Sequence, residues 1–124
     1  MNDTSRAFLR AAAILGFLAV MAGTFGAHGL PESMEERLKD TFDTGVRYHL
    51  VHALALLGCA GVCREGRPAK IAYWGFVAGT VLFSGSLYAL ALTNESKLGM
   101  IAPIGGLAYL AGWFALILEA NRES

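Results

Sequence analysis

The sequence predicts an all-α membrane protein, a single domain over residues 1–124 with four transmembrane helices and an amphipathic surface helix between the first two. Three observations lead to this fold class. Hydrophobic residues make up 55% of the chain and charged residues only 16%, against roughly 25% charged in an ordinary soluble domain. Four long runs contain no Asp, Glu, Lys or Arg, and an amphipathic segment separates the first run from the second.

The four uncharged runs predict membrane spans at about residues 8–29, 46–63, 71–93 and 98–118. A helix rises about 1.5 Å per residue and the hydrocarbon layer is about 30 Å thick, so roughly 20 apolar residues cross it. Backbone groups inside lipid must bond to one another, which favours helices. The first run also resembles a signal peptide, because Arg6 and Arg10 precede it. The three spans that follow favour a retained helix.

The amphipathic helix is expected over residues 33–44. Pro31 ends the first span, and Ser33 with Glu36 matches a capping box that opens a new helix. Apolar residues then recur every four positions, at Met34, Leu38, Phe42, Val46 and Leu50. We expect this helix to lie on the outer membrane surface and to bend at Gly45 into the second span.

Charge sets the expected orientation. An even number of spans places both termini on one side, together with six of the ten bases, namely Arg6, Arg10, Arg64, Arg67, Lys70 and Arg122. The other side has four bases, so the termini are expected on the cytoplasmic side of the membrane. The net charge of zero and the lack of a basic stripe give no indication of nucleic-acid binding.

Small residues are expected to pack the helices together. The chain has fifteen glycines, and those placed at helix-packing positions are Gly16, Gly23, Gly75, Gly79, Gly105, Gly106 and Gly112. Such residues allow close helix approach within lipid, either inside one chain or between chains. Pro103 is expected to kink the start of the fourth helix.

Three histidines form the candidate functional site. His28 ends the first span, while His49 and His52 are three residues apart on one face of the second, so all three are expected at one outer level. Three imidazoles can hold a metal with an open position. The alternative, which we favour, is that they bond to carbonyls and carboxylates and hold the surface helix in place.

The third span adds hydroxyl groups to this region. Ser84, Ser86 and Tyr88 are candidate ligand-binding residues, and they could equally bond to neighbouring helices. No Asp, Glu, Lys or Arg lies in the membrane core of any span, which argues against an ordinary proton-coupled or ion-coupled transporter. No phosphate-binding loop, GxSxG elbow or catalytic cysteine–histidine pair is present, so no enzyme class and no cofactor is strongly indicated.

Four segments in order resemble one known family: residues 23–30 (GTFGAHGL), 44–57 (TGVRYHLVHALALL), 82–90 (LFSGSLYAL) and 103–113 (PIGGLAYLAGW). The chain is similar to the domain-of-unknown-function 423 family of small bacterial membrane proteins, which is related to animal transmembrane protein 256. The resemblance implies four helices in the bacterial inner membrane. It also places His28, His49, His52, Ser84, Ser86 and Tyr88 at motif positions.

Three functions follow as hypotheses. The leading one is a non-enzymatic accessory or scaffold protein in the lipid bilayer, either self-associating as a homo-oligomer or attached to a larger membrane complex. The second is a module that binds or transports a small ligand beneath the surface helix, between the hydroxyls of the third span and the kinked fourth helix. The third is a metal- or haem-associated protein that uses His28, His49 and His52.

Overall fold

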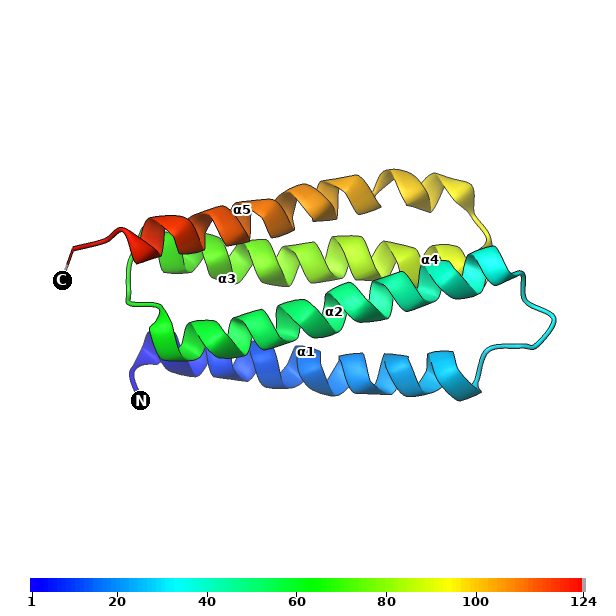
Figure 1. Cartoon of the computed structure of the whole chain (residues 1–124), viewed down its shortest axis with the longest axis horizontal. Helices are drawn as coiled ribbons and strands as arrows, with labels where there is room; N and C mark the ends of the chain where they lie inside the picture. The colour runs from blue at the N-terminus through cyan, green and yellow to red at the C-terminus, as the bar shows by residue number, and fades with distance from the viewer. Residues whose placement is uncertain (124) are drawn as a thin grey trace.

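The chain folds into four long helical rods that run along a common axis (Figure 1). A computed structural model describes residues 1–123. The first two rods are α1 (Asp3–His28) and α2 (Glu36–Val62). The third is built from α3 (Arg67–Gly79), the π-helical segment η1 (Thr80–Ser84) and α4 (Gly85–Thr93). The fourth consists of the 3₁₀ segment η2 (Ser96–Met100) and α5 (Ala102–Ala120).

All four rods are long and apolar enough to cross a membrane. Within residues 1–123 the chain forms helices and no strand. Figure 1 shows both termini at the same end, which is called the terminal end below. The opposite end carries the α1–α2 and α4–α5 connections. These findings confirm the predicted all-α bundle of four transmembrane helices.

The rods pack as two pairs. α1 lies mainly on α2, and α3 lies mainly on α5. The pairs join where α4 and η1 contact α2. A hydrophobic core links them and includes the fully buried Leu56 of α2 and Phe76 of α3.

α3 and α5 approach closely because glycines face each other. A Cβ atom at Gly75 would lie 2.7 Å from the carbonyl oxygen of Ala108 and 2.8 Å from the amide nitrogen of Gly112. Real Cβ atoms do not tolerate such distances from backbone, so Gly75 requires the absence of a side chain. Close backbone approach of this kind is how helices gain van der Waals contact in lipid.

The amphipathic segment differs from the predicted surface helix in its course. It is the first part of α2, which begins at Glu36 and continues unbroken through Gly45. The helix starts two residues later than the Ser33 cap predicts, with Glu35 at the N-cap position, because the amide of Met34 donates to the Pro31 carbonyl and closes a turn instead. Gly45 does not bend the helix, and a Cβ atom there would lie 2.9 Å from Cε1 of Tyr88. This glycine therefore makes room for a packed aromatic ring.

The fourth rod also begins differently from the prediction. Pro103 stands in the first turn of α5 and not inside a kinked helix. Proline is favoured in a first turn because its missing N–H has no intrahelical acceptor there. The change of direction expected at Pro103 is replaced by the transition at Ile101 from the 3₁₀ turn of η2 to α5.

Polar contacts close the terminal end. The buried carboxylate of Glu119 accepts a hydrogen bond of 2.6 Å from the backbone amide of Arg64, which follows α2. It also pairs with Arg122 at 3.0 Å, and Arg122 donates to the carbonyls of Arg64 and Glu65. These bonds tie the α2–α3 connection to the end of α5.

Candidate functional site

His52 of α2 has a hydrogen-bond partner at each ring nitrogen. Its Nδ1 lies 2.7 Å from the Tyr48 carbonyl, which can only accept. Its Nε2 lies 3.0 Å from the indole Nε1–H of Trp113 in α5, which can only donate. The two bonds together fix a neutral imidazole protonated at Nδ1, with the lone pair of Nε2 already used.

The same ring lies in an aromatic cluster between α2, α3 and α5. His52 stacks on Tyr109 with ring centroids 3.6 Å apart and an interplanar angle of 9°. Phe76 of α3 approaches it at 5.5 Å, and Trp113 meets it edge-on at 5.9 Å. Buried ring contacts of this kind add about 0.5–1.5 kcal/mol each beyond area burial. The imidazole therefore joins three helices.

His49 lies one turn earlier on α2 and contacts α4. Its Nδ1 is 2.8 Å from the hydroxyl of Tyr88. Its Nε2 is buried and has no hydrogen-bond partner among residues 1–123. The backbone carbonyl of Leu15 in α1 lies near this ring, without the geometry of a hydrogen bond. His49 thus connects α2 to α4 and faces α1.

The hydroxyl groups of the third rod bond inside the bundle. Ser84 donates to the Gly45 carbonyl of α2 at 2.7 Å, and Ser86 donates to the Phe83 carbonyl at 2.9 Å. Thr80 donates to the Phe76 carbonyl and accepts from the Tyr109 hydroxyl at 3.1 Å. These bonds engage the hydroxyl donors that a ligand or a polar path would otherwise use.

The π-helical segment η1 lies at the centre of these contacts. The amide of Gly85 donates to the carbonyl of Thr80, five residues earlier. A wider turn of this type rotates the residues that follow. Before the segment the rod packs on α5, and after it the rod packs on α2. The segment therefore lets one helix present Thr80 to α5 and Ser84 to α2.

The structure does not place the three histidines at one level. Gly26 of α1 faces Phe42 of α2, and Gly16 faces Ala53. His28 is exposed and lies beyond the level of Phe42, on the order of 10 Å along the axis from His49. The expectation of a common level was wrong because α2 runs straight through Gly45, so that its first turns separate His28 from the other two.

This separation also removes the three-histidine metal site. No group of three His, Cys, Asp or Glu side chains suited to a metal ion occurs in the described part of the chain. His52 has no free lone pair for a metal, because Nε2 accepts from Trp113. The structure therefore does not bring His28, His49 and His52 together as one set of metal ligands, and the haem-associated alternative stays a prediction.

The seven glycines selected from the sequence fall into three groups. Gly75, Gly79, Gly105 and Gly112 lie where a Cβ atom would clash with the facing helix. Gly16 and Gly23 face α2 at ordinary contact distance, 3.9 Å from Ala53 and 3.5 Å from Val46. Gly106 faces open space.

The sequence reasoning missed Trp113 and Tyr109 as partners of His52. A signal for them exists, because the two residues are four apart and therefore share one face of α5. What the sequence does not encode locally is the rotation of α5 that turns this face toward α2.

The fold and this interior define a class of protein: a small polytopic membrane protein whose buried polar groups link its own helices. The comparisons with known proteins give the family. Residues 22–106 match the family model described as Protein of unknown function (DUF423), and the chain belongs to this family of integral membrane proteins.

Three relatives illustrate how much of the chain this similarity covers. The chain is 43% identical to the UPF0382 inner membrane protein YgdD of Escherichia coli K12, over 96% of this chain and 92% of the relative. It is 40% identical to the UPF0382 membrane protein YwdK of Bacillus subtilis, over 94% and 98%. A UPF0382 membrane protein of Haemophilus influenzae is 38% identical over 88% and 89%. No solved structure matches the chain.

Proposed function

We propose that this protein is a non-enzymatic accessory protein of the inner membrane that acts by binding another membrane helix, in a second copy or in a larger complex. The observation that carries the proposal is a pair of glycines on α2. Gly58 and Gly61 are exposed, and a Cβ atom at either would meet nothing within 4 Å. Gly58 lies inside α2, where a glycine weakens the helix by about 1 kcal/mol relative to alanine. Packing inside the chain does not account for these two.

The surroundings of the two glycines fit a helix-binding surface. Large apolar side chains flank them on the same exposed side of α2, including Leu54, Leu57 and Val62. Small residues bordered by larger ones form a notch into which another helix can pack closely. The interior polar groups support the same role, because their bonds are made within the chain and stiffen the bundle that presents this notch.

The test uses glycines that differ only in location. Chemical crosslinking in intact membranes should give a product larger than the monomer for the wild-type chain and for Gly106→Leu, which alters an open glycine on α5. The double variant Gly58→Leu/Gly61→Leu should lose the product while its unfolding temperature stays unchanged. A product that survives in the double variant, or a wild-type chain that crosslinks to no protein, would refute the proposal.

We also propose that the terminal end faces the cytoplasm. At this end six bases stand against four acids, Asp3, Glu65, Glu119 and Glu123, for a net charge of +2 from side chains. The opposite end has four bases and six acids, for −2. An excess of Lys and Arg marks the cytoplasmic side of short-looped membrane proteins.

A further inference from the structure

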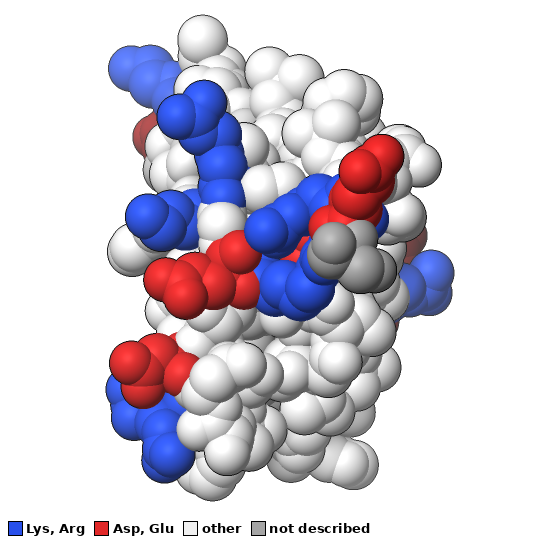
Figure 2. Space-filling view, turned by 90° about the vertical axis from the view of Figure 1, so that its left-hand side faces the viewer, with Lys and Arg blue, Asp and Glu red and all other residues white. Residues whose placement is uncertain are grey.

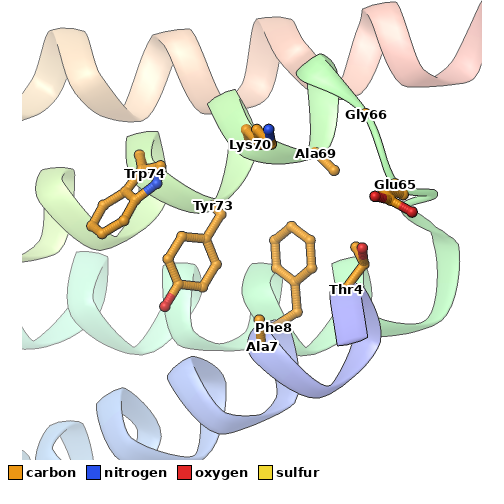
Figure 3. A pocket seen from close by; sticks show the side chains of 9 residues that line it. All are labelled: Thr4, Ala7, Phe8, Glu65, Gly66, Ala69, Lys70, Tyr73 and Trp74. Atoms are coloured by element: carbon orange, nitrogen blue, oxygen red, sulfur yellow. The ribbon is translucent and has the colours of Figure 1, made fainter. Parts of the chain in front are cut away.

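A groove opens between α1 and α3 at the terminal end (Figure 3). Its volume is about 240 Å³. Phe8 of α1 forms its floor and meets Tyr73 of α3 edge-on, with ring centroids 5.6 Å apart. Trp74 stands next to Tyr73 at 5.1 Å and is 64% exposed. Three aromatic rings thus line one part of the groove.

The groove follows from the pairing of the helices. α1 packs mainly on α2, and α3 packs mainly on α5, so α1 and α3 make few direct contacts. Ala69 and Gly66 keep the α3 side shallow, since neither has a long side chain. The channel therefore belongs to the architecture of the bundle.

Two side chains of opposite charge line the same groove. Lys70 lies on α3 and Glu65 in the connection that precedes it, with Thr4 of α1 next to Glu65 (Figure 3). The four ion pairs within residues 1–123 involve other residues, so Lys70 and Glu65 pair neither with each other nor with another charged side chain. Figure 2 shows that acidic and basic side chains gather together on this end of the molecule.

We propose that this groove binds a phospholipid whose headgroup carries both a phosphate and a primary ammonium, the ethanolamine class. One acyl chain lies along Phe8, Tyr73 and Trp74. The ammonium of Lys70 binds the phosphate, and the carboxylate of Glu65 accepts hydrogen bonds from the lipid ammonium.

Charge complementarity selects this headgroup over the alternatives. A lone cation would favour a purely anionic lipid, but Glu65 in the same groove repels a second negative charge. A choline headgroup has the same net charge and no N–H to donate, so it cannot bond to a carboxylate in this way. Aromatic rings suit the chain-to-headgroup boundary, because Trp and Tyr concentrate at that level of the bilayer.

The test is native mass spectrometry of the full chain released from bilayers of equal parts ethanolamine, choline and glycerol phospholipids. The wild-type chain should retain one ethanolamine phospholipid in preference to the other two. Glu65→Gln should reduce the preference for ethanolamine over choline about two- to fivefold, the range that one exposed ion pair supplies. Lys70→Gln should lower retention of all three lipids. The matched variants Glu32→Gln and Lys97→Gln, at the opposite end, should behave as wild type.

A further variant tests the channel without altering a charge. Ala7 lines the groove and is exposed, so Ala7→Phe fills it from the α1 side and leaves the core intact. This variant should retain no lipid after detergent exchange, with an unchanged unfolding temperature. The proposal is overturned if Ala7→Phe retains the lipid, if choline and ethanolamine lipids are retained equally, or if Glu65→Gln leaves the preference unaltered.

Discussion

His52 of α2 contacts α5 through a hydrogen bond from Trp113 and a stacked ring on Tyr109, and its ring also approaches Phe76 of α3. Its other hydrogen bond, to the Tyr48 carbonyl, stays within α2. We predict that His52→Ala destabilises the bundle by about 1–3 kcal/mol, because it leaves the indole N–H of Trp113 in the transmembrane helix α5 without its acceptor and removes the ring stacked on Tyr109. His28→Ala, at an exposed position, should change stability by less than about 0.5 kcal/mol. Unfolding by denaturing detergent measures both. Equal effects of the two variants would contradict the assignment.

The glycines offer a second comparison of single residues. Gly75→Ala should cost about 1–3 kcal/mol of unfolding free energy, because its Cβ atom would press on the backbone of α5. Gly58→Ala should be neutral or stabilise the chain by up to about 1 kcal/mol, because alanine is the better helix former and meets no neighbour. The same detergent titration measures both values. A destabilised Gly58→Ala monomer would show that this face packs within the chain.

Among the helices, the third rod packs on α5 before η1 and on α2 after it. This change of partner depends on the widened turn of η1. We predict that deletion of Val81, an exposed residue within η1, is tolerated. A one-residue deletion can convert the π turn to a regular α turn and leave both halves of the rod facing their partners. Deletion of Val77 in α3 should prevent folding, because it rotates every later residue by about 100°. Expression level and unfolding temperature of the two deletions test this difference.

The helices themselves were predictable because uncharged runs of sufficient length leave the backbone no other structure in lipid. The course of α2 was not, since Gly45 is compatible with both a bend and a close contact with Tyr88. The π-helix at Thr80–Ser84 was also missed. A π turn holds one more residue than an α turn and so shifts the helical periodicity. In a uniformly apolar helix no polar face is present to show that shift.

For the candidate site, the sequence indicated which polar residues lie in the interior better than it indicated which partners they contact. His49 bonds to Tyr88 of α4, and Ser84 bonds to the Gly45 carbonyl of α2. His52 bonds instead to Tyr48 of its own helix and to Trp113 of α5. His28 does not join them, because its level depends on how far α2 extends beyond the end of α1. The role of Trp113 depends on how α2 and α5 are rotated relative to each other. Trp113 and His52 are 61 residues apart in the sequence, and no local pattern specifies that rotation.

The molecule as a whole has an asymmetric charge distribution, and this predicts its orientation. The native Cys59 and Cys63 are buried and should not react with a soluble maleimide, so single cysteines can report on each end. In intact spheroplasts a membrane-impermeant maleimide should label Ser96→Cys and leave Glu123→Cys unlabelled. Inside-out vesicles should give the opposite result. Labelling of Glu123→Cys in spheroplasts would reverse the orientation proposed here.

Most hydrogen bonds of the interior side chains are made within the bundle, so we expect the protein to act through its outer surface. That surface includes the open notch at Gly58 and Gly61. The most direct test is the mass of the particle that is released from native membranes without harsh detergent. One chain weighs 13.2 kDa. We predict a defined assembly larger than one chain for the wild-type protein and a single chain for Gly58→Leu/Gly61→Leu. A wild-type particle that contains one 13.2 kDa chain and no other protein, with or without bound lipid, would contradict the proposed function.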